Sequence, residues 1–458
     1  MQVNKSIFRE NDIRGIYPEQ LNENTISIIG KAIAQKCRSQ GICSISVGRD
    51  GRLSGESLLN SFCNSLVSAG LDVTNVGLVT SPMLYFEAKK NTSKSGIVIT
   101  GSHNPKNHNG LKMVINDKPM SGLEVLKIIE DLDDDSYEKG TLKHKDIKED
   151  YLNEVEASIS IQGSKRYKVV IDSGNGVAGH VAPDLFKRIG CEVIELFSDV
   201  DGNFPNHHPD PSKLENVQDL IKSVKENNAD LGLAFDGDGD RVGLITNLGE
   251  NVFPDKYMMM LSESILSDSN GSIVYDVKCS NHLEKIIRNS SGIPIMAPTG
   301  HFHIKKTIKE NNSLLGGEMS GHIFFNDKWY GFDDGPYSGA RIIEALSKNT
   351  NYETISEIIS SYPQSFSTPE LNIDVTDENK FNIVESFISE NNLDGEKITL
   401  DGLRVNFENG WGLLRASQTS PKLVLRFEGD TIKDMEKIQA DFIAELSRIS
   451  PDIDINLT

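Results

Sequence analysis

Short apolar runs rich in β-branched residues alternate with longer amphipathic stretches through about the first 350 residues of this 458-residue chain. The runs lie at residues 44–47, 96–100, 168–171, 231–235, 272–277 and 293–297. Strand, helix and strand at this spacing predict α/β layers with mostly parallel sheets. A polar or glycine-bearing loop follows nearly every run. Because ligands of open α/β sheets bind where strands end, we expect the chemistry of the protein in these loops.

The chain is too long for a single hydrophobic core, and the strand-then-loop unit recurs in three successive blocks. The last ninety residues differ, because tight turns of glycine and asparagine join their apolar runs, which favours a small antiparallel sheet. Those runs are 397–406, 412–416 and 423–427. The expected domains are 1–150, 151–256, 257–368 and 369–458.

The charge balance narrows the class of partner. The 47 basic and 67 acidic residues give a formal net charge of −20, which argues against nucleic acid and anionic membranes as partners. No apolar run reaches the length of a membrane span, and the first residues lack the apolar stretch of a signal peptide. The five cysteines form neither a C-x-x-C pair nor a metal-ligand cluster. We therefore expect a soluble protein in the reducing cytoplasm.

A single serine stands where the apolar strand 96–100 breaks into the polar loop Gly101-Ser102-His103-Asn104-Pro105. Considered alone, Ser102 is more simply a turn or helix N-cap residue. Its interpretation depends on a second loop.

That second loop is Asp236-Gly237-Asp238-Gly239-Asp240-Arg241, which follows the apolar run 231–235. Three carboxylates at alternate positions form a cage for a hard divalent cation. An EF-hand loop would need Gly at the sixth position and Glu at the twelfth, where this chain has Arg241 and Asn247. A solvated acidic turn would leave three carboxylates repelling one another. A divalent cation held by the three aspartates, with Ser102 at the edge of a strand nearby, suggests phosphoryl transfer.

Near the end of the chain, Arg415 to Thr419 place one guanidinium, two hydroxyls and an amide within five residues. This density of donors suits a phosphate dianion that is bound but not transformed. A hairpin turn would explain Ser417 and Thr419 but not Arg415.

Taken together, the motifs resemble those of the α-D-phosphohexomutases, in the phosphomannomutase/phosphoglucomutase branch. They occur in the family's order over nearly the whole chain, at 8–15, 48–54, 100–105, 109–112, 206–211, 236–241, 317–322 and 415–421. The resemblance implies an α/β fold class, with three similar α/β domains whose sheets are mixed and mostly parallel. A C-terminal α+β domain would complete the fold around a central cleft.

The resemblance also implies roles for individual residues. Ser102 would be carried as phosphoserine, and Mg²⁺ would bridge Asp236, Asp238, Asp240 and an oxygen of phosphorylated Ser102. Glu318 and Ser320 would bind sugar hydroxyls, although their loop alone could be a turn with an incidental Glu. The candidate catalytic residues are Ser102, His103, Lys112, His322 and Arg14. Imidazole titrates near neutral pH, so His322 is a candidate acid/base, with a buried structural histidine as the alternative. The candidate substrate-binding residues are Arg241, Lys278, His301, Glu318, Ser320, Arg415, Ser417, Gln418 and Thr419.

The implied activity is the reversible conversion of hexose 1-phosphate and hexose 6-phosphate, an isomerase reaction of an intramolecular phosphotransferase in carbohydrate metabolism. It would pass through a phosphoserine enzyme and a hexose 1,6-bisphosphate, with Mg²⁺ and glucose or mannose 1,6-bisphosphate as activator. The partners would be mannose and glucose phosphates, and the protein a monomer or homodimer. One alternative is a phosphoglucosamine mutase, which usually has glutamine where this chain has Met319. Another is a catalytically silent paralogue that binds sugar phosphate.

Overall fold

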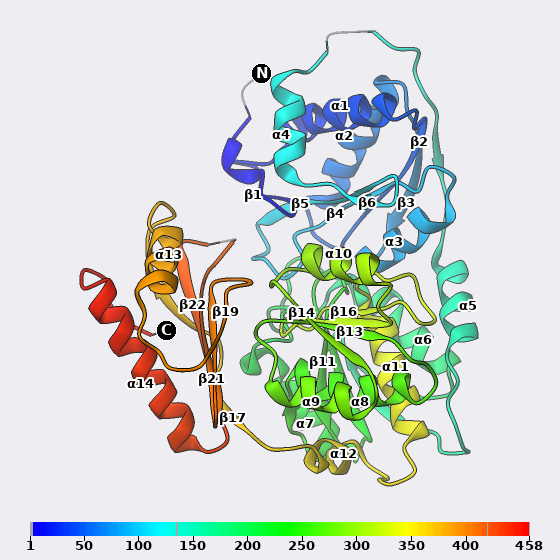
Figure 1. Ribbon diagram of the computed structural model, residues 1–458. Helices are drawn as coiled ribbons and strands as arrows, with labels where there is room; N and C mark the ends of the chain where they lie inside the picture. Colours follow the sequence, from blue (N-terminus) through cyan, green and yellow to red (C-terminus); the bar gives the residue numbers. More distant parts are fainter. Residues whose placement is uncertain (1–2, 134–135, 419, 458) are drawn as a thin grey trace. The chain divides into compact units, whose positions relative to one another are not determined.

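A computed structural model describes residues 3–133, 136–418 and 420–457 (Figure 1). The chain folds into two compact units, one made of Met1–Tyr257 and Ser320–Glu357, the other of Met258–Met319 and Ile358–Thr458. It passes between them three times: within helix α8 (Pro254–Leu266), between Met319 and Ser320, and within helix α12 (Ile355–Ser361). Among the described residues, no helix combines the length and apolar character needed to cross a membrane.

The first sheet of the first unit is mixed. Its strands run in the order β1 (Ile13–Ile16), β5 (His108–Ile115), β4 (Gly96–Ile99), β2 (Ser44–Arg49), β3 (Asp72–Leu78) and β7 (Leu142–His144), with β6 (Lys118–Pro119) beside β5. The pairs of β2 with β3 and β4 are parallel, whereas β5 is antiparallel to β1 and β4. Helices α1 (Glu23–Ser39), α2 (Gly55–Ser68) and α4 (Gly122–Glu130) lie on one face and α3 (Ser81–Lys90) on the other (Figure 1). This sheet places β4 between β5 and β2, with β1 on the other side of β5.

The second sheet of the same unit runs in the order β12 (Asn251–Val252), β11 (Val242–Thr246), β10 (Leu231–Phe235), β8 (Lys168–Asp172) and β9 (Glu192–Leu196). Its connecting helices are α5 (Lys148–Ser158), α6 (Ala182–Arg188) and α7 (Gln218–Glu226), and the 3₁₀ turns of this unit are Lys5–Ile7, Val177–His180 and Leu214–Val217. The later part of the chain adds to this unit the helix α11 (Gly335–Lys348), which packs against β10 and β11, and the short strand β16 (Ile323–Phe325), which belongs to neither of these two sheets. The parallel strands β8 and β10 are buried on both sides, which explains their uninterrupted apolar sequences.

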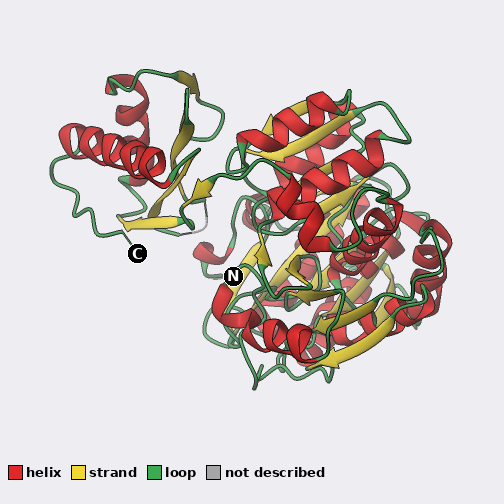
Figure 2. Ribbon diagram, turned by 90° about the horizontal axis from the view of Figure 1, so that it is seen from below, coloured by secondary structure: helices red, strands yellow, loops and turns green. Residues whose placement is uncertain are grey.

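The second unit holds two sheets. Strands β14 (Ile293–Ala297), β13 (Ser272–Asp276) and β15 (Leu315–Gly317) are parallel and are joined by α9 (Asn281–Asn289) and α10 (His301–Asn311). The C-terminal sheet is antiparallel, in the order β17 (Phe366–Ser367), β22 (Lys422–Gly429), β21 (Gly410–Ala416), β20 (Leu403–Phe407) and β19 (Glu396–Ile398), with β18 (Leu371–Asp374) beside β22. Helices α13 (Lys380–Glu390) and α14 (Ile432–Ile449) cover one face of it (Figure 2).

The predicted fold class is confirmed: mixed, mostly parallel α/β sheets are followed by a C-terminal α+β domain. One predicted run differs, because the segment 397–406 forms two strands, β19 and β20, rather than one. The chain turns between them at Gly402, whose φ of +78° lies in the left-handed region that favours glycine.

Candidate active site

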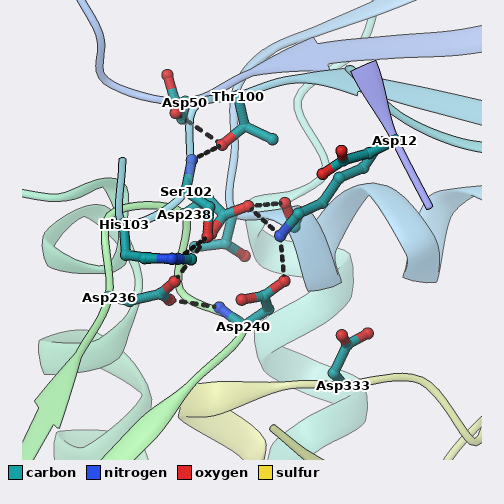
Figure 3. Close-up of polar contacts among 12 residues, drawn as sticks. Asp12, Asp50, Thr100, Ser102, His103, Asp236, Asp238, Asp240 and Asp333 are labelled. Carbon is teal, nitrogen blue, oxygen red and sulfur yellow. Dashed lines mark hydrogen bonds and ion pairs between the residues drawn. The ribbon is translucent and has the colours of Figure 1, made fainter. Parts of the chain in front are cut away.

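Ser102 lies in the loop that follows β4, and its side chain points to the aspartate loop (Figure 3). Its Oγ donates to Oδ2 of Asp236 at 3.0 Å and lies 3.2 Å from Nδ1 of His103. The residue is 2% exposed and has a φ of +49°, which is uncommon for a residue with a side chain. The structure thus joins the two loops that the sequence singled out, although 134 residues separate Ser102 from Asp236.

Asp236, Asp238 and Asp240 follow β10 and are completely buried. Burial and the charges of the other two carboxylates raise the pKa of Asp236 well above its ordinary value. Burial alone would also raise the pKa of Asp240, but Lys112 and His322 outweigh it and hold that pKa well below the ordinary value.

The three aspartates fit a divalent cation. One oxygen from each lies within 4.8 Å of the others, and Oδ1 of Asp238 has no hydrogen-bond partner among the described residues. An all-oxygen donor set of this kind suits a hard cation. The acidic cluster is therefore a candidate metal-binding site.

Cationic side chains surround the serine and the aspartates. Lys112, on β5, donates to Oδ2 of Asp238 at 2.7 Å and also to Oδ2 of Asp240. Burial would lower the pKa of Lys112, but these two carboxylates outweigh it and raise the pKa well above its ordinary value, so Lys112 is a cation here. Arg14, on β1, donates to the carbonyl of Thr100 at 2.6 Å. Burial and the nearby charge of Arg241 lower the pKa of His103 well below its ordinary value, so this imidazole is neutral.

Arg241 and His322 meet across an isolated β-bridge. Nε of Arg241 lies 3.9 Å from Oδ2 of Asp236 and donates to Nε2 of His322 at 3.3 Å. The other ring nitrogen of His322 is 2.8 Å from Oγ of Ser320. His322 also lies 3.3 Å from Oδ1 of Asp240, so the imidazole borders the aspartate loop.

The remaining candidates lie in the second unit. Lys278, in the loop after β13, donates to Oε2 of Glu370 at 2.9 Å. Glu318 accepts from the backbone N–H of Gly300 at 2.5 Å, next to the partly buried His301 at the start of α10.

Arg415 lies near the residues that precede α10, because Arg415 and Thr299 both donate to Asp401. Its Nε donates to Oδ2 of Asp401 at 2.8 Å, and Asp401 also accepts from the N–H of Thr299 at 3.0 Å. Ser417 is buried, whereas Gln418 is exposed and Thr419 lies outside the described residues. The structure therefore forms one cluster of candidates in each unit: Arg14, Ser102, His103, Lys112, Asp236, Asp238, Asp240, Arg241, Ser320 and His322 in the first, and Lys278, His301, Glu318, Arg415, Ser417 and Gln418 in the second.

Sequence reasoning missed several residues that touch these groups. Oγ of Ser81 donates to Oδ2 of Asp238 at 2.5 Å, and Asp12 accepts from Nε of Arg14 at 2.8 Å. The sequence Thr80-Ser81-Pro82 signals the start of a helix, and Thr80 does cap α3, but nothing in it indicates a contact with a residue far along the chain.

Comparison with known proteins gives the same family over the whole chain. The models of phosphoglucomutase/phosphomannomutase match in order: α/β/α domain I at residues 5–138, domain II at 149–249, domain III at 253–366 and the C-terminal domain at 370–445. A phosphomannomutase/phosphoglucomutase of Pseudomonas syringae pv. tomato is 47% identical over 455 residues, covering 98% of this chain and 97% of the relative.

Other relatives agree. A phosphoglucomutase of Neisseria gonorrhoeae is 44% identical over 450 residues, covering 96% of this chain and 97% of its own. The crystal structure of a phosphoglucomutase/phosphomannomutase family protein from Burkholderia thailandensis superposes with a TM-score of 0.93 at 40% identity, covering 100% of both chains. With a serine loop against an aspartate loop in its structure, and such relatives along its full length, this chain belongs to the phosphoglucomutase/phosphomannomutase family.

Proposed function

We propose that the chain is a phosphomannomutase/phosphoglucomutase, which interconverts hexose 1-phosphate and hexose 6-phosphate. The observation that carries the proposal is the contact of 3.0 Å between Oγ of Ser102 and Oδ2 of Asp236, in a buried site where carboxylates and cations meet. A nucleophilic oxygen among buried charges is suited to transfer of a phosphoryl group, because this chemistry depends on positioning and charge stabilisation. Full-length relatives that are named for these activities support the proposal.

In the proposed reaction, phosphorylated Ser102 gives its phosphoryl group to the free hydroxyl oxygen of the sugar monophosphate. The O–P bond to Ser102 breaks as the new O–P bond forms, and the sugar hydroxyl loses its proton. We propose that His322 accepts this proton, because Lys112 already donates to two carboxylates. The resulting hexose 1,6-bisphosphate returns its other phosphoryl group to Ser102, which completes the conversion. Arg14 and Arg241 stabilise the negative charge on the group in transit.

We assign the second cluster to substrate binding. The guanidinium of Arg415 and the donors of Ser417, Gln418 and Thr419 bind the phosphate that does not react, together with Lys278 and His301. Glu318 accepts hydrogen bonds from the sugar hydroxyls, and Ser320, which belongs to the first cluster, also forms hydrogen bonds with them. The bisphosphate binds with either its 1-phosphate or its 6-phosphate toward Ser102. The same residues bind the other phosphate and the sugar hydroxyls in both orientations, so they serve both half-reactions.

Asp236, Asp238, Asp240 and Ser102 would hold Mg²⁺. The all-carboxylate donor set and the unpartnered Oδ1 of Asp238 support this choice. When bound, the ion neutralises charge on the oxygens of the phosphoryl group.

We further propose that the enzyme works in the cytoplasm as a monomer or homodimer. Loss of the bisphosphate from the site would leave Ser102 unphosphorylated and the enzyme inactive. Glucose or mannose 1,6-bisphosphate would restore it, and we therefore expect either compound to act as an activator.

The test is phosphorus NMR of mannose 1-phosphate and of glucose 1-phosphate, each with the protein, Mg²⁺ and a catalytic amount of glucose 1,6-bisphosphate. Appearance of the 6-phosphates supports the proposal, and the ratio of rates gives the sugar preference. Release of inorganic phosphate would indicate a phosphatase instead. No change with either sugar would overturn the proposal, and conversion of glucosamine phosphate would then identify a phosphoglucosamine mutase.

A further inference from the structure

Arg52 is buried beneath the serine loop, although it has no place in the proposed chemistry. It is 1% exposed, and its guanidinium donates to four backbone carbonyls between Ser102 and His108. Nη2 reaches the carbonyls of Ser102 at 2.8 Å and Asn104 at 2.6 Å, and Nη1 those of Pro105 at 2.6 Å and His108 at 2.8 Å. One side chain therefore fixes the chain that follows the serine.

Asp50 fixes the chain that precedes the serine. Its Oδ2 accepts from Oγ1 of Thr100 at 2.7 Å and from the N–H of Gly101 at 3.0 Å. Oγ1 of Thr100 in turn accepts from the N–H of Ser102 at 2.8 Å. Asp50 and Arg52 are themselves an ion pair, with Nε of Arg52 3.3 Å from Oδ2 of Asp50.

The serine needs this support because its backbone is strained. A φ of +49° is uncommon for a residue with a side chain, and such a conformation persists only where the surroundings hold it. At Ser102 both the N–H and the carbonyl are held, by Thr100 and Arg52 respectively. The backbone conformation sets the direction of the bond from Cα to Cβ, and in this structure Oγ reaches Oδ2 of Asp236 at 3.0 Å.

Only a guanidinium can make this set of contacts. Its planar fork offers donors in fixed directions, whereas the ammonium of lysine is a point charge with three donors. The loop also packs closely against the guanidinium of Arg52, since a Cβ at Gly101 would lie 2.2 Å from Cζ of Arg52.

We propose that the buried Arg52–Asp50 pair is a positioning device that holds Ser102 in the geometry of phosphoryl transfer. The proposal rests on the proposed mutase function. Arg52 acts through the backbone of the loop, so its loss affects the rate of transfer and not the binding of the sugar phosphate.

The test is Arg52→Lys, which keeps the positive charge but loses the fork. We expect kcat to fall by about 10²-fold, the effect of a misplacement of about 1 Å, with KM within about threefold of the wild type. Single-turnover transfer from the phosphorylated enzyme should slow by the same factor. Arg341→Lys is the matched control, because Arg341 is also buried and paired, with Asp327 and Glu344, away from the serine loop. We expect the control to lose stability with kcat nearly unchanged.

A second readout is independent of activity. Hydrogen exchange of the amides of residues 100–108 should accelerate in Arg52→Lys and stay unchanged in Arg341→Lys. If Arg52→Lys does not fold, Thr100→Val removes the hydroxyl link on the other side of the serine, and we expect a fall in kcat of about tenfold at constant KM.

Three results would overturn the proposal. These are wild-type kcat in whichever of the two variants folds, a fall in kcat that Arg341→Lys matches, and unchanged exchange at residues 100–108. If the wild-type protein converts no sugar phosphate, the proposed function fails, and exchange of the loop amides alone then decides whether the pair positions Ser102.

Discussion

At the scale of single residues, the proposed function depends on Ser102. Ser102→Ala removes the oxygen that we propose as the acceptor of the phosphoryl group, so we expect mutase activity to fall by about 10⁴-fold or more. The backbone strain at this position is the same for both residues, and the melting temperature should therefore change little. Enzyme assay, intact-mass measurement of the phosphoenzyme and thermal unfolding check this expectation. Ser65→Ala is the control, because Ser65 is also buried but bonds a carbonyl within the helical layer. Residual phosphorylation of Ser102→Ala would point to another acceptor.

His207 makes a second prediction, about stability rather than activity. Its Nε2 lies 3.0 Å from Oδ1 of Asp172, and its other ring nitrogen lies 3.0 Å from the carbonyl of His208. Burial would lower the pKa of His207, but the carboxylate of Asp172 outweighs it and raises the pKa. The folded state therefore binds the proton more tightly than the unfolded state, so this stabilisation is fully present below the ordinary pKa of histidine. It is lost as the pH rises through the raised pKa.

His207→Gln should consequently lower the free energy of unfolding by roughly 1.5–3 kcal/mol at pH 6, and by clearly less at pH 9. Urea unfolding at the two pH values measures the difference. His144→Gln, at an exposed position on β7, provides a histidine loss without a buried partner. An equal loss of stability at both pH values would show that the ion pair with Asp172 does not matter.

Some residues of the site could be predicted from the sequence, whereas others could not. Ser102 and the three aspartates could be predicted because their residue types, spacing and position after apolar strands all point to one chemistry. Arg52 could not, because arginine is by default a solvated surface residue and its partners here are backbone carbonyls about 50 residues farther along. A backbone carbonyl that accepts a hydrogen bond leaves no pattern among the side chains of the sequence, so such a contact cannot be predicted from it.

At the scale of elements, the C-terminal sheet holds the loop that carries Lys278. Arg404, on β20, donates to the carbonyls of Val277 and, at 2.8 Å, of Cys279. Arg426, on β22, donates to the carbonyl of Lys278 at 2.5 Å. These two strands thus fix three successive carbonyls around the lysine that we assign to phosphate binding.

Arg404→Met should remove the donor to the carbonyls of Val277 and Cys279 and destabilise the second unit by roughly 2–4 kcal/mol. With the loop released, we expect KM for the sugar phosphate to rise about tenfold, a loss of about 1.4 kcal/mol of binding, with kcat little changed. Steady-state kinetics and thermal unfolding measure both effects. Arg288→Met, which removes an exposed arginine from α9, should change neither. An unchanged KM in a folded Arg404→Met would mean that the loop keeps its position without this support.

The elements were the most predictable level of the fold, because burial imposes a clear pattern on them. Parallel strands such as β8 and β10 are buried on both faces and show as continuous apolar runs. The join between β19 and β20 was missed although the sequence marks it, because Asp401-Gly402 is an Asp-Gly pair of the kind that forms hairpin turns.

At the scale of the whole molecule, the two compact units are interleaved along the chain. The segment 320–357 belongs with the first unit, although it follows part of the second. Local sequence patterns predict domains one after another and carry no mark of such a return, so this grouping is visible only in the structure. It matters for function because the serine and the three aspartates all lie in one unit.

Because the chain folds into two units, we expect Mg²⁺ to stabilise the first unit against unfolding and not the second. A ligand that binds only the folded state adds about 2.7 kcal/mol of stability at a hundred times its Kd, and here the carboxylates lie entirely in the first unit. The chain has two tryptophans, Trp329 in the first unit and Trp411 in the second, both buried. Trp411→Phe and Trp329→Phe therefore yield proteins whose fluorescence reports the unfolding of one unit each.

We expect Mg²⁺, compared with chelator, to raise the melting temperature reported by Trp329 and to leave that reported by Trp411 in place. Asp238→Asn, combined with Trp411→Phe, should abolish the rise, because it removes one of the carboxylates that we propose as ligands of the ion. A rise that persists in this variant would place the stabilising ion elsewhere. Equal rises at both tryptophans would show that the two units unfold as one cooperative body, so that an ion bound in the first unit also stabilises the unit that carries Arg415.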